Sequence, residues 1–150
     1  MPRYPNATYF LGRADREGNP ERERPDPLLV RHLGPAADAG RLELVDAERA
    51  IAPGVAMVAA PGESPGHRLV RVTSEGATFY SLGDLFHHPC EVAHRDWASS
   101  GRDRAALRAS REALLAAALP EEALLMTTHR PFPAFGRLRE TPTGVIRVGA

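Results

Sequence analysis

Residues 55–67 read Val-Ala-Met-Val-Ala-Ala-Pro-Gly-Glu-Ser-Pro-Gly-His, an apolar run followed by a turn-rich loop and a histidine. The continuous apolar run Val55–Ala60 predicts a buried strand. Pro61–Gly66 holds two prolines and two glycines in six residues, which indicates a tight loop. Gly66 allows the backbone to turn sharply before His67. The segment therefore places an imidazole on a loop at the end of a strand, where functional groups are often held.

Two later segments repeat this arrangement. The expected strand Thr78–Leu82 leads through Gly83 to Asp84, and the expected strand Leu124–Thr128 leads directly to His129. Taken singly, each residue has an ordinary explanation as a turn residue, a helix cap or a core histidine. Their shared position after apolar strands favours a common site instead. Imidazole nitrogens and a carboxylate suit Zn²⁺, Mn²⁺ or Fe²⁺, so we expect a metal site.

The remaining sequence predicts an α/β or α+β layered fold, rich in short strands, with one long helix late in the chain. The helix is expected over Arg102–Leu119, because its leucines recur on one face, Ser100 and Asp103 resemble a capping box, and Pro120 stops it. Strands are also expected at Thr8–Gly12, Leu42–Asp46, Glu48–Ala52 (pairing back on the preceding strand), Arg68–Thr73 and Val145–Val148. Leu28–Leu33 is expected to form a short helix or an apolar turn that Gly34 and Pro35 end. Loops are expected at Arg13–Asp26, at Gly83–Asp96 with room for one helical turn, and at Arg130–Pro142.

Composition limits the partners and the chemistry. The 150 residues suit one domain, and 19 acidic residues balance 19 basic ones, all of them arginine. A formal net charge of zero argues against non-specific nucleic-acid binding and against a polybasic membrane anchor. The single cysteine, Cys90, excludes an internal disulfide and a cysteine-based zinc cluster. The sequence shows neither a signal-peptide core nor an apolar stretch of bilayer length, so we expect a cytoplasmic protein.

Four segments resemble, in order, motifs of the metallo-β-lactamase superfamily, in its lactonase-like and organophosphate-hydrolase-like branch. Tyr4–Tyr9 resembles the F-P-N-A-x-Y stretch, and Ala60–His67 resembles the T-P-G-H-T-P-G-H segment. Gly83–Pro89 resembles the G-D-x-x-x-H-P segment, and Thr128–Gly136 resembles the late H-F-P-x-P-x-x-G segment. The resemblance covers nearly the whole chain. It implies an α/β fold, the second half of a metallo-β-lactamase αββα sandwich, with a mixed β-sheet and one long helix.

The resemblance also implies a dinuclear metal site, with zinc expected and manganese or iron as alternatives. In that family a hydroxide held by the metals attacks a small ester, lactone or related substrate. By motif, His67 would bind the first metal, Asp84 would bridge both, and His129 would bind the second.

Three further residues are implicated less directly. His87 and His88 would orient ligands or line the pocket, and a solvated or capping pair is an equal alternative. Phe132 would form part of the pocket wall, with core packing as the alternative.

The superfamily's H-x-H-x-D-H motif is absent. None of the six histidines stands in an H-x-H arrangement, and no Asp-His pair occurs. In the family this motif precedes the stretch that begins here at Tyr4. Residues 1–150 are therefore interpreted as a partial metallo-β-lactamase-like domain without its N-terminal metal-motif half, keeping three ligands of seven.

Half a sandwich leaves an apolar sheet face uncovered, so we expect a marginal chain, a homodimer or dependence on the missing half. Three functions stay open. The chain is a metal-dependent hydrolase that is truncated and inactive alone, a non-catalytic remnant or interaction module, or one half of a split enzyme.

Overall fold

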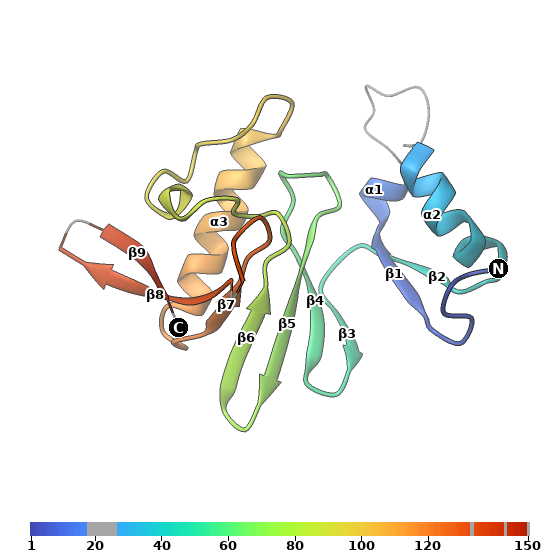
Figure 1. Ribbon diagram of the computed structural model, residues 1–150, viewed down its shortest axis with the longest axis horizontal. Coiled ribbons are helices and arrows are strands. Elements are labelled where there is room, and N and C mark those ends of the chain that lie inside the picture. The colour runs from blue at the N-terminus through green and yellow to red at the C-terminus, as the bar shows by residue number, and fades with distance from the viewer. Residues whose placement is uncertain (18–26, 133, 143, 150) are drawn as a thin grey trace.

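The computed structural model describes residues 1–17, 27–132, 134–142 and 144–149. Its centre is a seven-stranded mixed sheet of order β3-β4-β5-β6-β7-β8-β9 (Figure 1). Every neighbouring pair is antiparallel except β6 and β7, which run parallel. The predicted mixed sheet with one long helix is confirmed. The strands are β3 (Arg49–Ala52), β4 (Val55–Ala59), β5 (Arg68–Ser74), β6 (Ala77–Ser81), β7 (Leu124–Met126), β8 (Phe135–Thr141) and β9 (Gly144–Gly149).

The long helix α3 (Arg104–Ala118) forms the crossover from β6 to its parallel neighbour β7 and covers one face of the sheet (Figure 1). Asp103 caps its first turn, because the carboxylate accepts a hydrogen bond from the amide of Ala106 at 3.0 Å. The cap is therefore Asp103 rather than Ser100. The helix buries Leu107, Leu114 and other residues of one face in the main core.

Sheet residues alternate between two faces, and, Met57 apart, the buried apolar side chains of β4 to β7 lie on one of them. The core side carries Leu69, Tyr80 and Leu125, each 3% exposed or less. Complete burial of such a side chain is worth about 1.5–3 kcal/mol. The other side carries a row of partly exposed apolar residues, which we call the open-face row: Val55, Val70, Val72, Phe79, Leu124, Met126 and Phe135.

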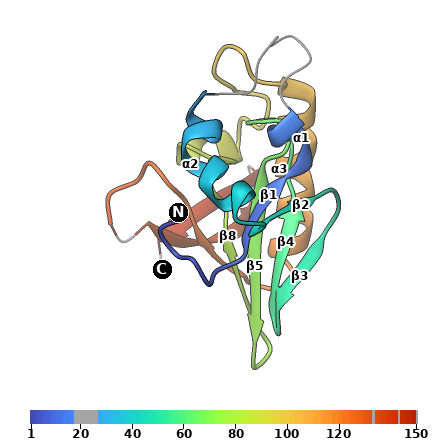
Figure 2. The same ribbon diagram turned by 90° about the vertical axis from the view of Figure 1, so that its right-hand side faces the viewer.

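A smaller unit lies beyond the β3 edge of the main sheet (Figures 1 and 2). Strands β1 (Tyr9–Gly12) and β2 (Leu42–Val45) pair in parallel, and helices α1 (Arg13–Glu17) and α2 (Pro27–Asp38) connect them. The Arg68 guanidinium ties β5 to this unit by donating to the carbonyls of residues 45–47. The unit also packs closely against the loop between β4 and β5, because a Cβ atom at Gly12 would clash with the carbonyl oxygen of Gly66.

Several element predictions were wrong. The expected loop Arg130–Pro142 contains strand β8, which pairs with β7 and β9. Glu48–Ala52 was expected to pair back on the preceding strand, but β3 pairs with β4. The expected loop Arg13–Asp26 begins with helix α1, and residues 18–26 lie outside the described part of the chain.

Helix α2 continues past the predicted stop at Gly34 and Pro35, because its last turn buries Ala36. Among the described helices, none has the length and apolar character needed to cross a bilayer.

Candidate metal centre

The parallel pairing of β6 and β7 builds the site. Tyr80 pairs with Leu125 and Ser81 with Met126, so both strands end at the same edge of the sheet. Asp84 follows β6 by three residues and His129 follows β7 by three residues. Because the carboxyl ends of parallel strands meet at one edge, the two side chains converge although 45 positions separate them.

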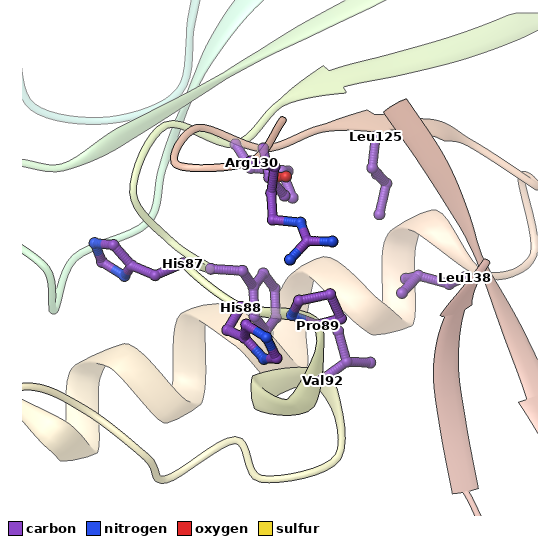
Figure 3. A pocket seen from close by; sticks show the side chains of 10 residues that line it. His87, His88, Pro89, Val92, Leu125, Arg130 and Leu138 are labelled. Atoms are coloured by element: carbon purple, nitrogen blue, oxygen red, sulfur yellow. The ribbon is translucent and has the colours of Figure 1, made fainter. Parts of the chain in front are cut away.

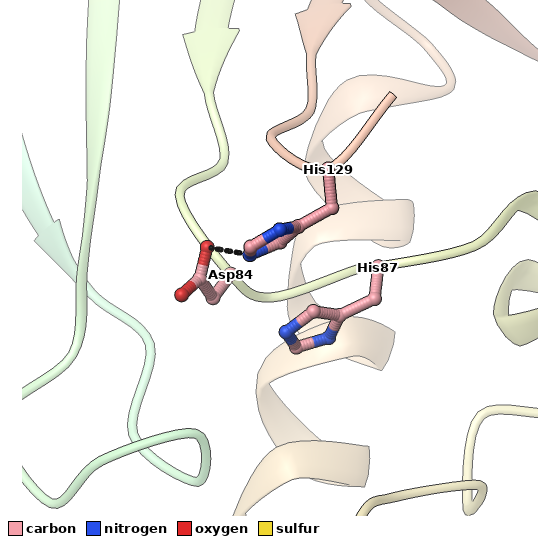
Figure 4. A group of neighbouring side chains, drawn as sticks. All are labelled: Asp84, His87 and His129. Atoms are coloured by element: carbon pink, nitrogen blue, oxygen red, sulfur yellow. Dashed lines mark ion pairs between the residues drawn. The ribbon is translucent and has the colours of Figure 1, made fainter. Parts of the chain in front are cut away.

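Asp84, His87 and His129 form a cluster, which we call the 84–87–129 cluster (Figure 4). One ligand atom from each side chain lies within 4.8 Å of the other two. His129 Nε2 is 3.2 Å from Asp84 Oδ1. The rings of His87 and His129 stack with their centroids 4.9 Å apart. Two nitrogens and one carboxylate oxygen at this spacing match the donors that Zn²⁺ or another first-row divalent cation takes in proteins.

The surroundings of Asp84 favour its ionised form. Partial burial by itself would raise the pKa of Asp84. The hydrogen bond from the Thr128 hydroxyl, 2.6 Å from Oδ1, and the nearby histidines outweigh it and lower the pKa below the usual value. An ionised carboxylate is the form that ligates a cation.

The backbone is left-handed at two positions of the site, at His129 and at Gly83, which directly precedes Asp84. His129 has a φ of 57° and Gly83 a φ of 51°. Left-handed backbone is uncommon at a non-glycine residue and occurs often at functional sites. His129 adopts it in the turn that follows β7, and its imidazole lies against Asp84 there.

His67 lies beside the cluster and bridges two backbone groups. Its Nδ1 is 3.0 Å from the carbonyl oxygen of Ala60, and its Nε2 is 3.1 Å from the amide nitrogen of Asp84. The first contact requires a proton on Nδ1 and the second a lone pair on Nε2, so the ring is neutral in this geometry. Burial lowers the pKa of His67, which agrees with that state. Among the described residues, His67 is not a member of the 84–87–129 cluster.

Helix α1 of the N-terminal unit holds the loop that precedes His67. The Asp15 carboxylate on α1 accepts hydrogen bonds from the Gly66 amide at 2.7 Å and from the Ser64 hydroxyl at 3.0 Å. Gly83 provides the space for the ring, because a Cβ atom there would lie 2.8 Å from His67 Nε2. The proline- and glycine-rich loop is therefore fixed to the N-terminal unit on one side and to the cluster on the other.

Among the described residues, His88 and Phe132 are not members of the 84–87–129 cluster. His88 is exposed, caps the short 3₁₀ helix η1 (Pro89–Val92), and places its Nδ1 2.9 Å from Cys90 Sγ. Phe132 is 90% exposed and is not among the residues that line the crease described next.

Figure 3 shows an apolar crease next to the cluster, into which Arg130 points. Its free volume is about 10 Å³, which is space for about one water molecule, so it is not a substrate pocket in this conformation.

The cluster gains one member that sequence reasoning placed outside the ligand set, namely His87. The spacing Asp84-x-x-His87 was the available signal, since two residues three positions apart in a turn can place their side chains on the same side of the backbone. The amides of His87 and His88 donate hydrogen bonds to the carboxylate of Glu91 farther along the chain, and residue spacing does not reveal these contacts.

No protein-family profile and no curated sequence matches this chain. Solved structures do match. AidC, a dizinc quorum-quenching lactonase solved with the product N-hexnoyl-L-homoserine, aligns over 98% of this chain at 21% identity and a TM-score of 0.71. AbOPH, a hydrolase in the β-lactamase superfamily, aligns over 98% of the chain at 16% identity and a TM-score of 0.81. The chain shares the metallo-β-lactamase fold of these hydrolases.

A third match is a variant of AiiA from B. thuringiensis with N-decanoyl-L-homoserine at its active site. It covers 88% of this chain at 18% identity and a TM-score of 0.65. The chain spans only 54–56% of the length of these three proteins. This share agrees with the sequence interpretation of a second half of a metallo-β-lactamase sandwich.

Proposed function

We propose that this chain carries part of the metal site of a divalent-metal-dependent hydrolase that acts on a small ester or lactone. The observation that carries the proposal is the convergence of Asp84, His87 and His129 at one sheet edge. The donor set fits the metal, because it combines an ionised carboxylate with two imidazole nitrogens. Zinc is our choice of metal, since AidC is a dizinc enzyme, and the same donors suit manganese and iron.

The residues of this chain would divide the work. Asp84, which accepts a hydrogen bond from Thr128, would supply negative charge to the cation, and His129 and His87 would supply imidazole nitrogens. His67 holds the Asp84 amide and so orients the turn that presents the carboxylate. A bound divalent cation lowers the pKa of water to near neutrality and polarises a substrate carbonyl. The ester or lactone class is proposed because the matched structures include lactonases.

We further propose that activity requires a second polypeptide segment. Three ligands do not build the two-metal site that the family resemblance implies, and the side chains of Asp84 and His129 are partly open to solvent. The open-face row offers apolar surface for such a segment, from a missing N-terminal half or from a second copy of the chain. Analytical ultracentrifugation of the chain alone would reveal the second copy.

Metal binding by single-residue variants tests the proposal. We expect the metal-free chain to bind about one Zn²⁺, measured by calorimetry, and Asp84→Asn or His129→Gln to weaken binding at least about 10-fold. His88→Gln is the matched control, because this histidine lies outside the cluster, and it should bind like the parent. A chain that binds no zinc, or that binds it equally well after both cluster substitutions, would overturn the proposal.

The same experiment assigns the third ligand. If the cluster as observed holds the metal, His87→Gln weakens binding and His67→Gln acts only through the position of Asp84. If the motif resemblance alone defines the ligands, His67→Gln gives the larger loss and His87→Gln gives none.

A further inference from the structure

The long helix buries a charged side chain completely. Arg111 lies in the middle of α3, is 0% exposed and is one of the largest fully buried side chains of the described structure. Burying a guanidinium is costly unless its charge and its donors are satisfied. Burial lowers the pKa of Arg111, and the nearby carboxylate of Glu91 opposes that effect. A residue with this cost needs a set of partners, and these partners all lie in one segment.

The partners are the backbone of residues 85–97, the segment that leaves the metal cluster. Arg111 Nε donates to the carbonyl oxygen of Leu85 at 2.8 Å. Its Nη1 donates to the carbonyl oxygens of Arg95 at 3.1 Å and Trp97 at 2.5 Å. The guanidinium also lies over the ring of Phe86, with Cζ 4.9 Å from the centroid. One side chain therefore clamps both ends of the segment onto α3.

A carboxylate extends this clamp to His87. Arg111 Nη2 is 3.3 Å from Glu91 Oε2. The same oxygen accepts hydrogen bonds from the amides of His87 at 2.6 Å and His88 at 3.1 Å. The path from the helix to the metal cluster thus runs Arg111, Glu91, His87 amide.

We propose that Arg111 is the positioning residue of the 84–87–129 cluster. It fixes the Leu85 carbonyl, directly after Asp84, and through Glu91 it fixes the amide of His87. Two of the three cluster side chains are thereby oriented by one buried guanidinium that touches neither of them. The effect of Arg111 on metal affinity rests on the proposed metal-dependent function, whereas its effect on the His87 amide can be tested without metal.

A purely structural role would give a different pattern. Arg111 would then contribute to folding in the same way as any buried residue of α3, and its loss would lower global stability alone. Leu115→Ala supplies the matched comparison. Leu115 is 5% exposed on the same helix, so its substitution removes core packing and leaves the Arg111 contacts in place. Glu91→Ala supplies a second, milder variant, which removes the ion pair with Arg111 and the acceptor for the amides of His87 and His88. It leaves the three carbonyl contacts of Arg111 in place.

The first measurement uses metal-free protein and amide hydrogen exchange, well below each variant's unfolding midpoint. We expect the His87 amide to exchange at least about 10-fold faster in Arg111→Met and Glu91→Ala than in Leu115→Ala. Equal rates in the three variants would overturn the proposal. Because no metal is present, this result does not depend on the proposed function.

The second measurement is the dissociation constant for Co²⁺, followed by its visible absorption. Loss of a partner that orients ligands costs about 10- to 100-fold in metal affinity, so we expect this loss in Arg111→Met and a smaller one in Glu91→Ala. Leu115→Ala should retain the parent affinity. An affinity loss in Leu115→Ala as large as in Arg111→Met would assign Arg111 to folding alone. A parent chain that binds no Co²⁺ would overturn the metal function and leave the exchange test standing.

Discussion

Replacing Gly83 by alanine should destabilise the chain through a contact with His67. Gly83 has a φ of 51°, and a Cβ atom there would lie 2.8 Å from His67 Nε2. Left-handed backbone costs an L-residue about 1–2 kcal/mol. The displaced ring would also lose its hydrogen bond with the Asp84 amide, worth about 0.5–1.5 kcal/mol. The free energy of unfolding should therefore fall by about 2–3 kcal/mol.

Gly76→Ala isolates the backbone part of this cost. Gly76 has a φ of 79°, and nothing lies within 4 Å of a Cβ atom built there. Urea unfolding of metal-free protein, analysed by linear extrapolation, should give about 1–2 kcal/mol for Gly76→Ala, below the value for Gly83→Ala. In a His67→Ala background the excess at Gly83 should vanish, because the two residues are in contact. Equal losses for both glycines, or an excess that persists without the ring, would refute the reasoning.

Burial lowers the pKa of His67 in the folded chain, so the unfolded chain binds the proton more readily. The free energy of unfolding should therefore fall as the pH drops from 6.5 through the lowered pKa of the folded chain. Urea midpoints with chelator should show this slope, at most about 1.4 kcal/mol per pH unit, and His67→Gln should flatten it; an unchanged slope contradicts the assignment. Asp15→Ala removes two hydrogen bonds and should lower the free energy of unfolding by about 2 kcal/mol, and Ser64→Ala removes one and should lower it by about half as much. Asp38 is exposed, so Asp38→Ala should leave the free energy of unfolding unchanged in the same assay. Phe132→Ala should change the unfolding free energy by less than about 0.5 kcal/mol, since the ring is 90% exposed, and a loss of several kcal/mol in thermal unfolding would place it in a core.

The predictable part of the fold was the part with strong local patterns. The helical spacing of Leu107, Leu114 and Leu115 located α3 to within two residues. The expected strands Arg68–Thr73 and Thr78–Leu82 match β5 and β6 to within one residue at each end. Strand β8 was missed because prolines surround it and its apolar residues are sparse. Its pairing with β7 and β9 stabilises it, and such long-range pairing leaves little trace in the local sequence.

The candidate site shows the same division. The positions of Asp84 and His129 followed from their place after strands, because strand ends at one sheet edge bring residues together regardless of the distance in sequence. The place of His87 did not follow. It is set by Glu91 and Arg111, which act through backbone hydrogen bonds that a motif does not encode.

The parallel pairing of β6 with β7 involves three residue pairs, and it sets the separation of Asp84 and His129. A slip of one residue moves a strand by about 3.3 Å and turns each of its side chains to the opposite face. Such a slip would expel Leu125 from the core at the same moment as it separated the two ligands. Mutations that preserve the packing of β7 therefore preserve the ligand spacing, and selection for a stable chain alone would maintain the geometry of this site even while the chain catalysed nothing.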